Sequence, residues 1–141
     1  MFKRIELPYD YADLEPCIDR ETVETHYEKH HKTYTENFNK AIEGVDGLRG
    51  KSALEILSHL EQVPENKRKA VRNNGGGYLI HNLYFESLAP DGKKPSSAFK
   101  HSLEKEFGGM EPMLEQLHSA ATTDLFGSGW AWLACENGKF S

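Results

Sequence analysis

One long amphipathic pattern near the start of the chain limits the possible folds more than any other feature. Asp19 is suited to cap a helix, and the pattern continues through Ile42 until Gly44 and Gly47 end it. We therefore expect one long helix over residues 20–43. His26, His30 and Tyr34 follow one another at i, i+4 and i+8, which places them on one stripe of such a helix. A surface helix has no structural need for this stripe, so the density of imidazoles and phenols indicates a functional site.

More helical patterns follow the first one. Ser52 and Glu55 form a capping-box pattern before a short apolar run that Pro64 closes, and a third helical segment begins near Glu65. The segment Asn73–Gly77 then leaves two alternatives open. Each glycine costs about 1 kcal/mol in a helix interior, which favours a loop; alternatively, the glycines let another element pack very closely.

An apolar helical stretch over residues 78–88 comes next, and we expect His81 to be buried among its aromatic neighbours. After a turn-rich linker, the sequence predicts helices at about 97–107 and 110–121. Residues 128–135 alternate large and small side chains like a strand, and residues 136–139 form a strong hairpin-turn pattern. Only two residues follow this turn, which would leave a strand with an unpaired edge. We therefore expect a part of the sheet to be missing.

Composition and charge exclude several classes of partner. The chain has 141 residues, 38% of them hydrophobic, which is enough for a real core in one or two small lobes. A net charge of −5 and a pI near 5.8 argue against nucleic acid or an anionic membrane as partner. No apolar run approaches a membrane span and no signal peptide is visible, so we expect a cytoplasmic protein. Cys17 and Cys135 are too far apart in sequence to indicate a disulfide framework or a thiolate metal site, and we expect both to be ordinary buried residues.

The histidines differ in what their surroundings predict. His31 lies in a polar setting, for which a surface or ordinary core role is expected. His26 and His81 lie on separate predicted helices beside aromatic residues, and imidazoles that face each other across a helical hairpin often build a metal site. Spacing alone leaves the metal site and the core role equally open. A local zinc site from His26, His30 and His31 is disfavoured, because His31 lies about 140° around a helix from His26.

Four segments, in order along the whole chain, resemble the iron/manganese superoxide dismutases. They are Leu7-Pro8-Tyr9-x-Tyr11-x-x-Leu14-Glu15-Pro16, His26-x-x-x-His30-His31-x-x-Tyr34, Arg72-Asn73-Asn74-Gly75-Gly76-Gly77-x-x-x-His81 and Phe126-Gly127-Ser128-Gly129-Trp130-Ala131-Trp132-Leu133. Four independent motifs in the right order make the resemblance highly specific. It implies an α+β fold, with an N-terminal arm and α-helical hairpin domain over residues 1–90 and an incomplete C-terminal α+β domain over residues 91–141.

The same resemblance implies roles for individual residues. His26 and His81 would be metal ligands, while Tyr34 and His30 would act in catalysis from the substrate funnel. The ion would be manganese or iron, one per complete chain, and it would alternately oxidise and reduce superoxide, with protons supplied through hydrogen-bonding side chains. The complete protein would be a homodimer.

Three further residues would support the metal site. Trp130 and Trp132 would belong to the aromatic wall of its pocket, with Trp130 nearer the metal. Gly77 resembles the manganese-type pattern, in which a Gln from a later strand reaches over the glycine, so manganese is favoured over iron. That Gln would lie beyond Ser141.

The chain also departs from the family pattern at its C-terminal end. The family completes its site with an Asp and a third His from a later Asp-x-Trp-Glu-His-Ala-Tyr segment, which is absent, so the chain is expected to be a C-terminally truncated member. Two neutral imidazoles are a weak site for manganese and favour copper, nickel or zinc. The alternative function is a non-catalytic helical scaffold or interaction module that pairs through the open strand at residues 129–135.

Overall fold

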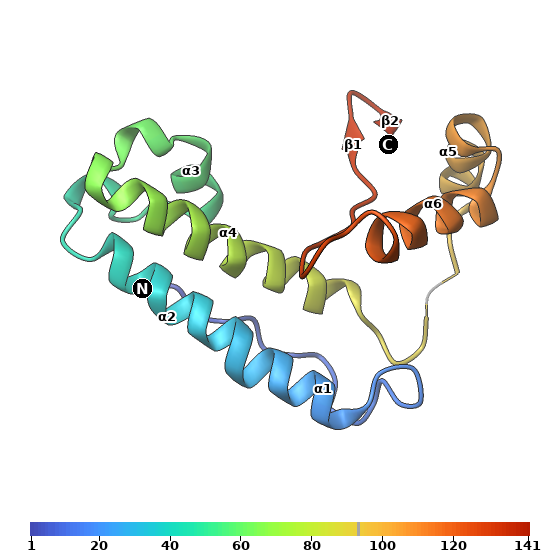
Figure 1. Ribbon diagram of the computed structural model, residues 1–141, viewed down its shortest axis with the longest axis horizontal. Coiled ribbons are helices and arrows are strands. Elements are labelled where there is room, and N and C mark those ends of the chain that lie inside the picture. Colours follow the sequence, from blue (N-terminus) through green and yellow to red (C-terminus); the bar gives the residue numbers. More distant parts are fainter. Residues whose placement is uncertain (93) are drawn as a thin grey trace. The chain divides into compact units, whose positions relative to one another are not determined.

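The computed structural model describes residues 1–92 and 94–141, which form two compact units. The first unit, Met1–Gly92, is an extended arm followed by a helical hairpin (Figure 1). Its helical elements are α1 (Arg20–Thr25), η1 (His26–His31), α2 (Lys32–Ile42), η2 (Asp46–Leu48), α3 (Ala53–Ser58), η3 (Leu60–Gln62) and α4 (Glu65–Ser87). The second unit contains α5 (Ser97–Phe107), α6 (Met110–Thr122), β1 (Cys135–Glu136) and β2 (Lys139–Phe140). Helices with a small antiparallel hairpin confirm the α+β class.

The first helical path begins where the sequence predicts, with the Asp19 side chain accepting a hydrogen bond from the backbone N–H of Thr22. The prediction of one regular helix is wrong in its middle, because η1 is π-helical. Its inward residues explain why. Tyr27, His31 and Thr35 follow one another at intervals of four, and in an α-helix each such step overshoots a full turn by about 40°. A π-helix has more residues per turn, which reduces this rotation around the helix axis and keeps the three side chains on the inner face.

The glycine-rich segment lies inside α4, which runs back alongside α2 without a break (Figure 1). A Cβ atom added to Gly75 would lie 2.8 Å from the Phe38 ring, and one added to Gly77 would lie 2.3 Å from the Tyr34 ring. The close-packing alternative is therefore confirmed and the loop alternative is wrong. The glycines lower the helix propensity of α4 at these positions. The close approach of α2 and α4 depends on their lack of side chains.

The core of the first unit consists of two clusters joined by the arm. One surrounds Phe38, Ile56 and Val71, and the other surrounds Val23 and Phe85. The arm reaches both clusters. The Phe2 ring stacks on Phe38 at a centroid distance of 4.8 Å, and the Tyr9 hydroxyl donates to the backbone oxygen of Phe85 at 2.9 Å. The shorter helix α3 begins with the predicted capping box of Ser52 and Glu55.

In the second unit, Ser96 caps α5 and Gly108 ends it with a φ of +82°. The predicted turn is confirmed: Glu136 pairs with Lys139, and both turn residues have positive φ, as in a type I′ hairpin. The predicted strand over residues 128–135 is wrong except at its last residue. Ala134 exchanges backbone hydrogen bonds with Ser141, and the preceding residues have no pairing strand among those described.

Two further observations concern the surface. Cys17 and Cys135 are both exposed, so the expectation of buried cysteines is wrong. Each follows a segment without helix or strand. Among the described residues, no helix is both long and apolar enough to cross a membrane.

Candidate metal centre

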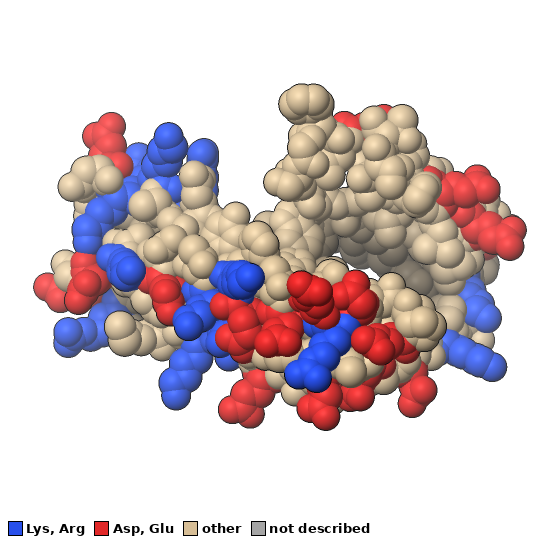
Figure 2. All heavy atoms as spheres, turned by 60° about the horizontal axis from the view of Figure 1, so that its bottom comes forward, with Lys and Arg blue, Asp and Glu red and all other residues tan. Residues whose placement is uncertain are grey.

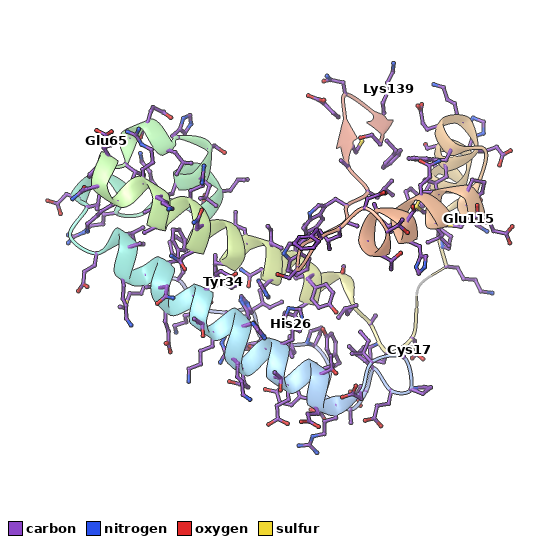
Figure 3. All side chains as sticks on the ribbon, viewed as in Figure 1. Cys17, His26, Tyr34, Glu65, Glu115 and Lys139 are labelled. Carbon is purple, nitrogen blue, oxygen red and sulfur yellow. The ribbon has the colours of Figure 1, made fainter. Side chains whose placement is uncertain are left out.

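His26 and His81 lie against each other across the hairpin. His26 opens the π-helical turn η1 and His81 lies in the middle of the C-terminal half of α4. Their ring centroids are 4.9 Å apart and the ring planes are nearly perpendicular, at 82°. Figure 3 shows His26 and Tyr34 projecting from their helical path toward α4. The structure therefore brings the two predicted ligands together.

A hydrogen bond to the helix backbone fixes the orientation of the His81 ring. Only 4% of this residue is exposed, and its Nδ1 lies 2.6 Å from the backbone oxygen of Gly77. Because a carbonyl oxygen can only accept, Nδ1 must carry the proton and the lone pair is on Nε2. Metal-binding histidines are commonly held in this way, with one nitrogen donating to a carbonyl and the other directed at the ion.

The surroundings keep both imidazoles neutral. Burial lowers the pKa of His26 to about 4, with a further lowering from the nearby His81 and His30. Burial also lowers the pKa of His81, although the hydrogen bond to Gly77 acts in the opposite direction. A histidine must be neutral to bind a metal ion, so the two rings are in the required state at neutral pH.

Tyr34 and His30 lie beside this pair. The Tyr34 ring is 5.1 Å from that of His81 and passes directly over Gly77, while the residue is 36% exposed. The His30 ring meets His26 edge-on at 5.9 Å. Gly77 thus leaves room for Tyr34, which is the close packing that the sequence left open as an alternative.

The sequence reasoning missed two neighbours of the imidazole pair. The Tyr84 ring lies 5.0 Å from His26, and His31 is completely buried with its ring stacked on His81 at 5.6 Å. A signal existed for each. Tyr84 follows His81 at i+3 on the same helical face, and His31 follows the inward-facing Tyr27 at i+4.

Trp130 and Trp132 belong to the second unit, where their rings stack at 5.7 Å. Their place in the wall of a metal pocket remains a prediction. Among the described residues, no group of three or more His, Cys, Asp or Glu side chains is arranged to hold a metal ion. Two neutral imidazoles suit a transition metal, and they form one part of a coordination sphere rather than a complete one.

Charge is distributed unevenly around the hairpin. Residues 6–28 contain eight acidic side chains against the single Arg20, a net charge of −7, whereas the whole chain carries −5. Figure 2 shows Asp and Glu gathered over the part of the hairpin that contains α1, and Lys and Arg more frequent toward its other end. The acidic residues are Glu6, Asp10, Asp13, Glu15, Asp19, Glu21, Glu24 and Glu28.

Facing imidazoles on two antiparallel helices are an arrangement that helical proteins commonly use to build metal sites. Comparison with known families identifies the protein more closely. Residues 1–89 match the alpha-hairpin domain of the iron/manganese superoxide dismutases, and residues 95–141 match the C-terminal domain of the same family. The chain belongs to the iron/manganese superoxide dismutase family.

Similar proteins from three Listeria species are each named superoxide dismutase [Mn]. The protein from Listeria monocytogenes is 46% identical over 135 residues, and those from Listeria innocua and Listeria ivanovii are 45% identical over the same length. Each alignment covers 95% of this chain and 66% of the relative. The chain therefore spans slightly less than two thirds of the length of these relatives.

Proposed function

We propose that this chain contributes to a superoxide dismutase, in which two molecules of superoxide and two protons give dioxygen and hydrogen peroxide. His26 and His81 would hold a manganese or iron ion, with manganese favoured by the names of the relatives. When bound, such an ion supplies the redox couple that alternately oxidises and reduces superoxide. The observation that carries the proposal is the neutral His26–His81 pair, with the His81 proton held on Nδ1 by Gly77.

The protein side chains have separate tasks in this proposal. His81 keeps a fixed tautomer, so its Nε2 lone pair is presented in one direction. Tyr34 lies against His81 and is partly exposed, so its hydroxyl is suited to pass protons between solvent and the site. His30, beside His26 and exposed, would serve the same substrate entrance. By the family resemblance, Trp130 and Trp132 would belong to the aromatic wall of the pocket.

Membership of the family also supports proposals for the oligomeric state, the localisation and the domains of the complete protein. The complete protein would be a cytoplasmic homodimer that acts on superoxide, without nucleic acid or membrane as partner. Residues 1–90 would form the arm and hairpin domain, and residues 91–141 would form part of the C-terminal domain.

The proposal is tested by metal binding and activity in the purified 141-residue chain. We would load it with Mn²⁺ and with Fe²⁺, measure metal content by elemental analysis, and follow the loss of superoxide. In addition, Mn²⁺ broadens nuclear magnetic resonance signals of nearby protons. We expect the ring signals of His26 and His81 to broaden at lower Mn²⁺ concentrations than those of His59, which is exposed on another part of the hairpin.

Three variants separate the outcomes. His26→Ala and His81→Ala should abolish the selective broadening, and His59→Ala should leave it unchanged. Metal-dependent superoxide loss that disappears in both site variants supports the full proposal. Selective binding without superoxide loss contradicts the activity and favours the scaffold function, while broadening that is equal at all histidines contradicts the metal ligands.

A further inference from the structure

His31 is the most completely buried polar side chain of the hairpin. It is the last residue of η1, none of it is exposed, and neither ring nitrogen has a hydrogen-bond partner in the described part of the chain. Buried imidazoles with both nitrogens unsatisfied are rare, because the water that the ring has lost must be replaced. This residue therefore needs an explanation that ordinary core packing does not give.

The ring of His31 is held flat behind that of His81. The two ring planes differ by only 12° at a centroid distance of 5.6 Å, and the Phe85 ring lies at 5.8 Å in a similar orientation. Tyr27 meets the His31 ring at a steeper angle of 67°, at 5.7 Å. With these neighbours on several sides, His31 has little freedom to turn, and its position limits the positions that the His81 ring can take.

An unsatisfied acceptor lies close to this unsatisfied ring. Asn82 follows His81 in α4, and its Oδ1 is buried without a hydrogen-bond partner. Burial lowers the pKa of His31 to about 4, and the Asn82 side chain acts in the opposite direction. An imidazole carries at least one N–H in either protonation state, so His31 can donate to an amide oxygen.

We propose that His31 donates a hydrogen bond to Oδ1 of Asn82, and that the two residues form a positioning pair for the imidazole of His81. This hydrogen bond would satisfy Oδ1 of Asn82 and one of the two ring nitrogens of His31. The His81 ring would then be fixed at two points: Gly77 holds its Nδ1, and the locked His31 ring supports its face. The proposed hydrogen bond does not depend on metal binding by His81. Its effect on metal affinity does, and therefore rests on the proposed function.

The hydrogen bond is tested without any metal. In the full chain labelled with ¹⁵N at histidine, long-range proton–nitrogen correlation spectra report which ring nitrogen of His31 is protonated and how fast that proton exchanges. Asn82→Leu removes the acceptor at nearly constant size, and we expect the His31 N–H signal to shift and its exchange to accelerate at least tenfold. Asn73→Leu, at an exposed position of the same helix, is the matched control. An unchanged His31 signal in Asn82→Leu would overturn the pair.

The positioning effect is tested with Cu²⁺ alone, since two neutral imidazoles bind it more tightly than other divalent first-row ions. Electron paramagnetic resonance reports the nitrogen ligands, and titration gives the affinity. We expect Asn82→Leu to weaken Cu²⁺ binding about tenfold, because substitution of residues that orient metal ligands commonly has an effect of this size. Asn73→Leu should leave the affinity unchanged.

His81→Ala distinguishes failure of this inference from failure of the proposed function. If His81→Ala leaves Cu²⁺ affinity intact, the proposed ligand is wrong, and the spectra of His31 still decide the hydrogen bond. If His81→Ala weakens binding and Asn82→Leu does not, the positioning effect is wrong. Circular dichroism of each variant confirms folding, and Asn82→Ser, which keeps a smaller acceptor, should restore part of the affinity lost in Asn82→Leu.

Discussion

Two neighbouring glycines of α4 have opposite surroundings, although their sequence context is nearly the same. A Cβ at Gly77 would lie 2.3 Å from the Tyr34 ring, whereas a Cβ at Gly76 would meet nothing within 4 Å. Tyr34 can lie against His81 only because Gly77 has no side chain. The glycine thus acts on the candidate site through a tyrosine on the opposite helix.

This contrast gives a prediction with an internal control. Gly77→Ala should lower the free energy of unfolding by about 1–3 kcal/mol, because the overlap with Tyr34 outweighs the gain in helix propensity. Gly76→Ala should raise it by about 0.5–1 kcal/mol, since only the propensity changes. Urea denaturation followed by circular dichroism measures both. Equal effects in the two variants would contradict the close contact at Gly77.

Tyr11 provides a prediction about pH. Its hydroxyl donates to the Glu28 carboxylate at 2.7 Å, and burial together with this hydrogen bond raises the pKa of Tyr11 to about 12. A raised pKa in the folded state stabilises the fold below pH 10, the ordinary value for tyrosine, and this contribution is lost as the pH rises from 10 toward 12. The near-ultraviolet absorbance of tyrosinate should show a late titration that is smaller by one tyrosine in Tyr11→Phe, since Tyr9, Tyr27 and Tyr84 also have raised pKa values.

Glu28→Gln is the companion variant to Tyr11→Phe. Removing the carboxylate charge should move the titration of Tyr11 back toward pH 10, since two of the causes of its raised pKa come from Glu28. Glu24→Gln, one helical turn away, should leave that titration in place. A late titration of the same size in Glu28→Gln as in the unaltered chain would contradict the role of Glu28 in raising the pKa of Tyr11.

At the scale of the elements, the π-helical turn is the least regular part of the hairpin and lies where the candidate ligands begin. Removing one residue from a π-helical turn restores an α-helical turn and leaves the flanking helix nearly in place. Removing one residue from a regular helix rotates everything beyond it by about 100°. The two kinds of deletion should therefore have very different costs.

Deleting Lys29, an exposed residue of η1, should cost less stability than deleting Glu36, an exposed residue of α2. The second deletion turns Phe38 away from the core, for which a loss of about 3–5 kcal/mol is expected. Thermal unfolding of the two variants gives the comparison. If the Lys29 deletion is as damaging as the Glu36 deletion, the extra residue of the π-helical turn is essential to the hairpin.

Caps, turns and motifs made much of the fold predictable, because their signals are local. Asp19 and Ser52 cap helices as expected, and the turn at Asn137 and Gly138 has the expected geometry. Features that depend on a distant partner were not predictable. The strand after residue 128 needs a neighbour to pair with, and the helix through Gly75 depends on how closely Phe38 approaches.

In the candidate site, too, the residues with local sequence signals were predictable and those that depend on distant contacts were not. His26 and His81 could be singled out because their aromatic neighbours and the family motifs lie close to them in sequence. The burial of His31 was missed because its sequence neighbours are polar, although its spacing of four from Tyr27 was a signal for the inner face of the helix. Close packing at Gly77 was one of two open alternatives, and Tyr34 could not be named as its partner because the contact joins residues more than forty positions apart in the chain.

At the scale of the whole molecule, the main imbalance is the acidic segment over residues 6–28. Like charges so close together repel one another, and dissolved salt screens this repulsion over distances of about 10 Å. Ion pairs such as Arg4–Glu28 offset only a part of it. The fold should therefore become more stable as salt is added at neutral pH.

We expect the midpoint temperature of thermal unfolding to rise with sodium chloride concentration. The corresponding gain in the free energy of unfolding should be about a few tenths of a kcal/mol. Asp10→Asn removes one charge from the segment and should reduce this response. Glu115→Gln removes a charge from α6 in the second unit and is the control. A midpoint that falls with added salt would indicate that attractive ion pairs dominate instead.

The attachment of the arm has a consequence for synthesis on the ribosome. Tyr9 bonds to the backbone of Phe85, 76 residues later, and Tyr78 bonds to the backbone of Lys3 across 75 residues. At translation rates of about 5–20 residues per second, the first residues made must wait about 4–15 seconds for these partners. During this interval the aromatic side chains of the arm are available to chaperones, so the beginning of the chain is among the last parts of the hairpin to reach its native position.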